Sequence, residues 1–170
     1  MPLVELTAII PDRPFDPKVF EREVARVLDN ELREIYRLYK MCWRTWSGAT
    51  PNMARMRVMG KDESYAEVYT ADSGHGNEKL MWLDSGVPGR TITARRAPYL
   101  FFQSKFKAKT RRNVAGSMPG GKYGDQYTKK RQVDWHGIEA RNFSETIARV
   151  RNKRFQQAVA NAFDKAARSF

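Results

Sequence analysis

One long run of amphipathic periodicity, between residues 16 and 46, constrains the fold of this 170-residue chain more than any other feature. Asp16 followed by Pro17 is a typical helix start, because aspartate caps the first free amides and proline is tolerated in the first turn. Apolar residues then recur at steps of three and four, the spacing of one helical face. They are Phe20, Val24, Val27, Leu28, Leu32, Ile35, Tyr39, Cys42, Trp43 and Trp46. The pattern predicts a helix of about 45 Å that stops near Ser47 and Gly48.

A helix of that length is large for a chain of this size, whose compact radius of gyration would be about 15–16 Å. We therefore expect the chain to be elongated, or its long helix to pack partly on a neighbour. The hydrophobic content of 41% and aromatic content of 12% are enough to fill one core. Length and composition together predict a single domain over residues 1–170.

Shorter patterns predict a small, mostly antiparallel sheet and a second helix. Alternation of apolar and polar residues favours strands over 4–10, 53–59, 64–70 and 91–94, with a glycine turn at 73–77 that leads into 79–83 in a β-like middle. The capping-box spacing from Asn142 to Glu145 predicts a C-terminal helix over about 143–168. Its apolar stripe includes Val150, and Arg151 falls on its basic side. The expected fold class is α+β, with the two helices packed on the sheet.

An extended basic β-hairpin arm is predicted over about residues 99–135. Apolar and basic side chains alternate from Tyr99 to Arg111, a glycine-rich tip follows, and residues 127–135 return as a strand. Nine cations of this arm form the candidate binding site: Lys105, Lys107, Lys109, Arg111, Arg112, Lys122, Lys129, Lys130 and Arg131.

The positive charge of the chain lies almost entirely in its C-terminal part. The net charge is +12, yet residues 1–92 carry −1 and residues 93–170 carry +13. This asymmetry indicates a polyanion nearby, and sequence-independent contact with phosphates is one use of the arm. Three other uses stay open: a solubilising surface, a solvated edge strand whose lysines prevent aggregation, and an arm that clasps a neighbouring subunit.

No catalytic, metal-binding or cofactor-binding pattern is found in the sequence. His75 and His136 lie in separate turns without the spacing of metal ligands, and Cys42 falls on the apolar face of the long helix. Ser85 lacks the context of a nucleophile, and the segment at Lys122 lacks the spacing of a phosphate loop. We therefore expect a non-enzymatic protein without metal or cofactor.

The sequence also lacks an apolar run long enough to span a bilayer and the pattern of a signal peptide. Its single cysteine excludes an internal disulfide. We expect a soluble protein made in the cytoplasm, with no membrane partner.

Four tryptophans, seven tyrosines and nine phenylalanines exceed what one small core needs, so some of these rings are expected at subunit interfaces. The candidates are Trp46, Trp82, Trp135 and Phe143. The alternative is that all the aromatic rings belong to the core.

Two segments of the sequence resemble a known family. Residues 82–92, followed by 94–102, resemble the central block of the neck and tail-completion proteins of long-tailed bacteriophages. Residues 133–143 resemble the block that precedes the C-terminal helix of that family, with Trp135, His136 and Gly137 where His-Pro-Gly is common. The order of predicted elements fits over roughly residues 16–168.

The resemblance implies a structural virion protein at the head–tail junction or the top of the tail, made in the host cytoplasm. It implies a homo-oligomeric ring, expected to be a hexamer, that surrounds the DNA path as a head–tail connector or tail-completion subunit. Head-closure, tail-terminator or tail-tube proteins would be its axial partners, with DNA passing through the lumen. The family brings no catalytic activity.

Two other functions remain as hypotheses. One is a free nucleic-acid-binding protein without sequence specificity, which the basic arm favours. The other is a nuclease or other enzyme of a mobile element, against which the missing metal-ligand pattern argues.

Overall fold

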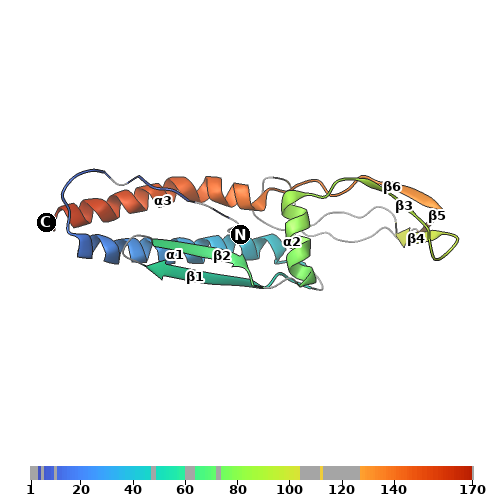
Figure 1. Cartoon of the computed structure of the whole chain (residues 1–170), viewed down its shortest axis with the longest axis horizontal. Coiled ribbons are helices and arrows are strands. Elements are labelled where there is room, and N and C mark those ends of the chain that lie inside the picture. Colours follow the sequence, from blue (N-terminus) through green and yellow to red (C-terminus); the bar gives the residue numbers. More distant parts are fainter. Residues whose placement is uncertain are drawn as a thin grey trace. The chain divides into compact units, whose positions relative to one another are not determined.

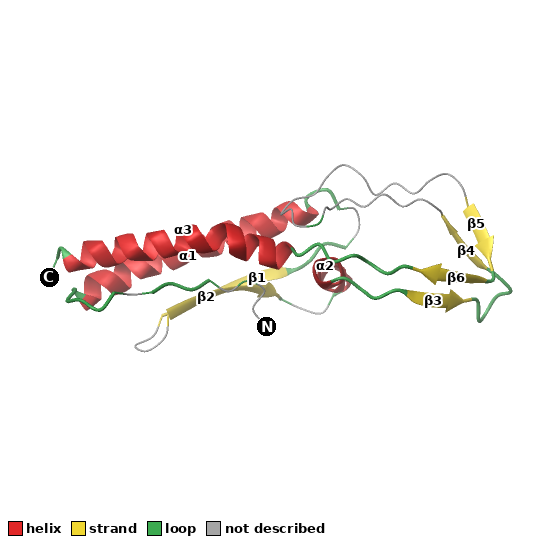
Figure 2. Cartoon of the chain, turned by 90° about the horizontal axis from the view of Figure 1, so that it is seen from above, coloured by secondary structure: helices red, strands yellow, loops and turns green. Residues whose placement is uncertain are grey.

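The computed structural model describes residues 4, 6–9, 11–46, 49–59, 64–71, 74–103, 112 and 127–169. Its elements in chain order are α1 (Pro17–Trp43), β1 (Met53–Met59), β2 (Ser64–Thr70), α2 (His75–Ser85), β3 (Arg90–Thr93), β4 (Leu100–Gln103), β5 (Tyr127–Lys130), β6 (Gln132–Trp135) and α3 (Phe143–Ala167) (Figure 1). The predicted α+β class is confirmed: long N- and C-terminal helices pack together, and the strands form three two-stranded antiparallel sheets (Figure 2).

The chain divides into two compact units. The first comprises Met1–Lys40, Asn52–Asp72 and Ser144–Phe170, and the second comprises Met41–Pro51 and Ser73–Phe143. A domain is a part of the chain that could fold alone, and a division by contacts does not test this. The single domain over residues 1–170 therefore stays a prediction.

Helix α1 begins as the sequence predicts. The Asp16 carboxylate accepts hydrogen bonds from the backbone amides of Lys18, at 2.8 Å, and Val19, at 3.3 Å, so it satisfies two of the donors that every helix start leaves open. The helix ends at Trp43, slightly before the predicted stop, and Trp46 lies in the turn that follows.

In the first unit, α1 and α3 run antiparallel (Figures 1 and 2). Glu23 contacts Lys165 at 2.8 Å, Glu31 contacts Arg151, and the Tyr39 hydroxyl lies 2.6 Å from that of Ser144, so positions rise along one helix as they fall along the other. Between them lies the core, which is made by Leu28, Leu32, Ile35 and Tyr39 from α1 and Ile147, Phe155, Val159, Ala162, Phe163 and Ala166 from α3.

A buried ion pair joins the two helices. The Arg151 guanidinium donates two hydrogen bonds to the Glu31 carboxylate, at 2.8 and 2.6 Å, and both side chains are only 9% exposed. The prediction that Arg151 lies on an exposed basic side is therefore wrong. The hydrogen bonds from Arg151 to Glu31 raise the pKa of Arg151 above its usual range, so the arginine stays charged.

The apolar stripe of α3 is also rotated from its prediction. Val150, assigned to the stripe, is 51% exposed, whereas Phe155 is buried. Position 151 points toward α1 because its guanidinium finds a carboxylate there, and position 150 consequently faces outward.

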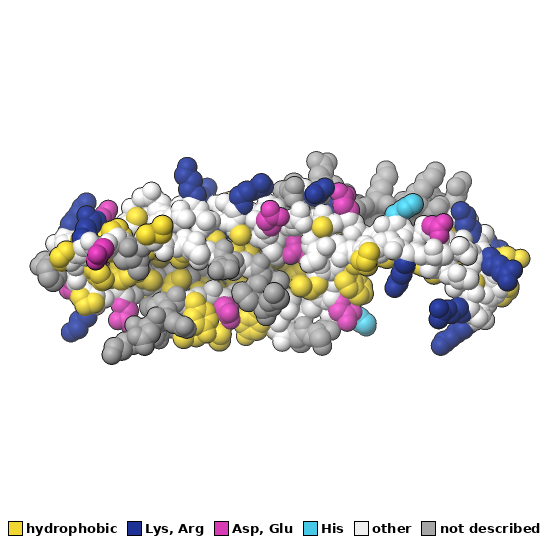
Figure 3. All heavy atoms as spheres, turned by 45° about the horizontal axis from the view of Figure 1, so that its top comes forward, with side chains coloured by type: hydrophobic (Ala, Val, Ile, Leu, Met, Phe, Trp, Pro, Cys, Tyr) yellow, Lys and Arg dark blue, Asp and Glu magenta, His cyan; other side chains and the backbone are white. Residues whose placement is uncertain are grey.

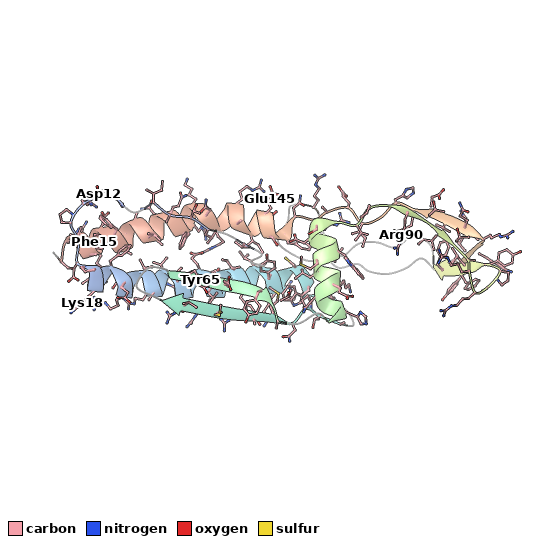
Figure 4. All side chains as sticks on the ribbon, in the orientation of Figure 1. Asp12, Phe15, Lys18, Tyr65, Arg90 and Glu145 are labelled. Carbon is pink, nitrogen blue, oxygen red and sulfur yellow. The ribbon has the colours of Figure 1, made fainter. Side chains whose placement is uncertain are left out.

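Strands β1 and β2 form a hairpin that packs on α1 through one face. Their register runs from Met53 opposite Thr70 to Met59 opposite Ser64. On the inner face, Arg57 contacts the Asp29 carboxylate at 2.6 Å. The outer face carries exposed apolar side chains, those of Met56, Val58 and Tyr65, the last of which is labelled in Figure 4.

The predicted strand over residues 4–10 is not found in its described part, residues 4 and 6–9. Leu6 and Ala8 instead pack against a cluster of Leu28, Phe155 and Val159, and the Thr7 amide donates to the Asn152 side chain at 3.3 Å. Side-chain packing on the helices, rather than strand pairing, holds this segment.

The glycine turn predicted at 73–77 and the β-like continuation at 79–83 are wrong, because His75–Ser85 forms helix α2. The backbone carbonyl of Gly74 accepts the amides of Asn77 and Glu78, at 2.8 and 3.2 Å. Gly76 is needed for close approach, since a Cβ there would lie 2.2 Å from the Thr50 carbonyl oxygen.

Replacement of Glu31 by alanine should lower the free energy of unfolding by about 3–5 kcal/mol, because it leaves the Arg151 charge buried without a partner. The double replacement of Glu31 by Leu and Arg151 by Met should restore most of that loss, since two apolar side chains need no ionic partner. Denaturant unfolding measures both changes.

The matched control is Glu34→Ala, which removes the exposed pair with Arg37, 2.8 Å apart. It should cost less than about 1 kcal/mol. Equal losses for Glu31→Ala and Glu34→Ala would contradict a structural role for the buried pair.

Candidate functional site

Two distant segments of the second unit are joined by backbone hydrogen bonds into one ladder, formed by residues 83–93 and 132–142. The amides and carbonyls of Val87 and Ile138 bond reciprocally at 2.8 and 2.9 Å, and the Arg141 amide donates to Leu83 at 2.8 Å. Strands β3 and β6 continue the ladder, from Arg90 opposite Trp135 to Thr93 opposite Gln132.

Glycines make the closest contacts of the ladder possible. Gly86 and Gly137 have positive φ angles of 79° and 85°. A Cβ on Gly137 would lie 2.1 Å from the Val87 carbonyl oxygen, and one on Gly89 would lie 2.9 Å from that of Trp135. A side chain at Gly137 is therefore excluded both by backbone conformation and by space.

Asn142 closes the ladder at the start of α3. Its amide donates to the Asp84 carbonyl at 3.1 Å, and its φ is 54°. A residue that caps a helix start normally has an extended backbone, so the left-handed Asn142 departs from the predicted capping box.

Beyond the ladder, β4 and β5 form a second ribbon, with Leu100 opposite Lys130 and Gln103 opposite Tyr127. The predicted antiparallel hairpin is confirmed for these residues. The returning strand is not continuous, however: it breaks at Arg131, whose carbonyl accepts the Ala94 amide at 3.0 Å, and β6 then pairs with β3 instead of β4.

The nine predicted cations divide between described and undescribed parts of the arm. Arg112, Lys129, Lys130 and Arg131 are exposed, whereas Lys105, Lys107, Lys109, Arg111 and Lys122 lie outside the described residues. Figure 3 shows dark blue Lys and Arg side chains gathered around the end of the second unit that carries β4 and β5.

Three more arginines of the second unit are exposed on β3 or directly after it, namely Arg90, Arg95 and Arg96. The sequence offered a signal for Arg95 and Arg96, because two successive arginines follow the predicted strand 91–94 directly. Between residues 86 and 135, Asp134 is the only acidic residue that the structure describes, and its carboxylate accepts the Thr91 hydroxyl at 2.8 Å.

Aromatic side chains on β4 and β5 lie among these cations. The Phe101 and Tyr127 rings are stacked, with centroids 5.2 Å apart, yet they are 69% and 60% exposed. The Lys129 ammonium lies 4.2 Å from the ring centroid of Tyr99, a cation–π contact. Large exposed rings of this kind are typical of a binding surface.

The two ribbons line an open apolar hollow of about 360 Å³. Its lining residues are Ile92, Leu100, Phe101, Phe102, Val133 and Trp135. Cross-strand partners share a face, so Lys130 projects on the same face as Leu100. Arg90, labelled in Figure 4, lies over Trp135 with 5.6 Å between guanidinium and ring centroid.

The described residues of the ladder and the arm form no core of their own. None of residues 86–102, 112 and 127–142 has a buried side chain. Two-stranded ribbons are marginally stable in water unless an apolar face is covered. The exposed rings and the hollow are therefore surfaces that a partner would stabilise.

The four predicted interface aromatics differ in exposure. Trp82 is 50% exposed, and Trp46 and Trp135 are partly buried, the former beneath the Lys79 ammonium at 4.7 Å. Phe143 has no exposed surface, so we place it in the core and keep the interface prediction for the three tryptophans.

The residues considered for chemistry form no metal-binding group among the described residues. His75 is exposed and 3.4 Å from Glu78, His136 is exposed after β6, and Cys42 is fully buried, as predicted. No group of three His, Cys, Asp or Glu side chains suited to a metal ion occurs in the described part of the chain. The absence of enzyme activity and of cofactors stays a prediction.

Within the described residues, the helices are all too short or too polar to cross a membrane. Comparison with known proteins found no match to a family model, to a curated protein or to a solved structure.

Replacement of Gly137 by alanine should open the ladder. Strain at positive φ and the clash with the Val87 carbonyl should together cost about 3 kcal/mol. We expect amide hydrogen exchange in residues 83–93 and 132–142 to accelerate roughly 100-fold. Gly74→Ser is the control, because Gly74 caps the start of α2 with an ordinary φ of −67°, a position that serine favours. Unchanged exchange in the Gly137 variant would contradict the assigned contact.

Proposed function

We propose that this chain is a structural, non-enzymatic virion protein of a long-tailed bacteriophage. In this proposal it forms a homo-oligomeric ring at the head–tail junction or the top of the tail, and the ring surrounds the DNA path. Its axial neighbours are head-closure, tail-terminator or tail-tube proteins.

The ladder is the observation that carries the proposal. The two sequence blocks that resemble neck and tail-completion proteins meet there, because residues 83–92 of the first block pair with residues 133–142 of the second. Gly86 and Gly137, which belong to the two blocks, are the residues that the close contacts need. The residues that carry the resemblance therefore act together, because they form one set of backbone contacts. This supports a fold shared with that family rather than two chance matches.

The distribution of charge supports a polyanion inside the ring. The second unit holds 15 Lys and Arg against 5 Asp and Glu, a net +10, whereas the first unit has a net charge of +2. A second copy of the chain offers no excess of acid to neutralise the arm. DNA in the lumen would supply the negative charge that neutralises the arm, and its phosphates would bind the arm without regard to sequence.

Exposed apolar groups elsewhere support lateral contacts between copies. Trp82 on α2 and the outer face of β1–β2, with Met56, Val58 and Tyr65, project apolar surface to solvent. Closed rings use two different surfaces of each subunit, and each of the two units offers exposed apolar side chains for such contacts.

Neutralisation of Lys105, Lys107, Lys109 and Arg111 to glutamine should leave the fold intact and impair particle assembly or retention of packaged DNA. We expect the infectious titre to fall at least about tenfold, because the arm loses four contacts with phosphate. Circular dichroism of the purified variant checks the fold.

The control instead removes four exposed cations of the first unit: Arg149, Lys153 and Arg154 on α3, and Arg168 in the turn that follows it. This variant has the same net charge and should assemble normally. An unchanged titre in the arm variant would contradict a role for these cations at the DNA path.

A free nucleic-acid-binding protein is the alternative that the basic arm favours. It would bind a duplex of about 30 base pairs as a monomer, with log K falling steeply against log salt. A ring subunit acts by avidity within the assembly, so we expect the monomer to bind more weakly than about 1 μM at about 150 mM salt. Tighter monomer binding with a steep salt slope would favour the alternative.

A further inference from the structure

We propose that the apolar hollow between the β3–β6 and β4–β5 ribbons is a docking site for an acidic segment of a partner protein that inserts one or two apolar side chains. The docking site is inferred from the apolar lining of the hollow and from the cations around it, all of which belong to the second unit. Only the assignment of the partner to the same particle rests on the proposed function.

The chemistry of the hollow selects a ligand with apolar groups. All six lining residues are apolar or aromatic, and the volume of about 360 Å³ is at the lower end of the range for ligand pockets. Duplex DNA presents phosphates and sugars at its surface and keeps its bases stacked inside. It would cover the cations around the hollow but leave the hollow unfilled.

The surroundings of the hollow select negative charge. Arg90 lies over Trp135, and Lys130 projects beside Leu100, so a cation accompanies the lining of each ribbon. Arg95, Arg96, Lys129 and Arg131 are also exposed nearby in sequence. An apolar side chain in the hollow would thus place neighbouring carboxylates within reach of several cations.

A second copy of this chain is a poor occupant, because no excess of acid is available in either unit. An acidic segment with an apolar centre meets both requirements. It would also supply the apolar cover that the arm lacks, and so convert two marginal ribbons into a stable element.

Fluorescence anisotropy with the purified full-length protein tests the proposal. The probe is a labelled peptide of three glutamates, phenylalanine, leucine and three more glutamates. The comparison peptide has two serines in place of the central pair. Burial of a phenylalanine or leucine is worth about 1.5–3 kcal/mol, so we expect the first peptide to bind at least about tenfold more tightly at about 150 mM salt.

Variants assign the binding to the hollow. Phe101→Ser removes an exposed lining side chain and should abolish the difference between the two peptides. Arg90→Ala combined with Lys130→Ala should weaken both peptides. Val150→Ser, at a half-exposed position on α3 of the first unit, should change neither.

Equal binding of the two peptides, or no binding of either, would overturn the proposal. So would tighter binding of a ten-nucleotide oligothymidine that Phe101→Ser abolishes, since that result would assign the rings to single-stranded nucleic acid. The proposed function fails separately, if the chain is absent from particles, and the peptide result does not depend on that outcome.

Discussion

The close backbone contact between Val87 and Ile138, at 2.8 and 2.9 Å, is the constraint on which the second unit depends. It brings together segments about fifty residues apart in the sequence and sets the register of β3 with β6. Gly137 makes this contact possible, because any side chain there would overlap the Val87 carbonyl. The ladder thereby sets the position at which the β4–β5 ribbon and its basic side chains begin.

The two units differ in what stabilises them. The first has a core between α1 and α3 and a buried pair, Glu31 with Arg151, that favours one alignment of the helices. The arm of the second has exposed rings, an apolar hollow and most of the net charge, but no buried side chain among its described residues. A partner that is both anionic and able to cover apolar surface would complete it. In the function that we propose, this complementarity serves assembly.

The sequence predicted the elements whose signals are local. The Asp16 cap, the face of α1 and both strands of the first hairpin follow from local spacing and capping. The bounds of α3 were also predicted, although Asn142 does not have the extended backbone of a usual helix cap. Prediction from the sequence failed where a distant residue decides the outcome. Gly76 was assigned to a turn, but it lies in helix α2, where its backbone approaches Thr50 closely. Arg151 was assigned to a basic side, but it is buried and binds the carboxylate of Glu31, 120 positions away in the sequence. The hollow was likewise not predictable, because it forms between ribbons whose pairing switches at Arg131.

Cryo-electron microscopy of purified phage particles tests the central claim most directly. The account predicts a closed ring of this chain at the head–tail junction or the top of the tail, with the basic arms at the DNA path or on an acidic neighbour. Particles that lack the chain, together with a purified protein that remains monomeric by mass measurement, would contradict it.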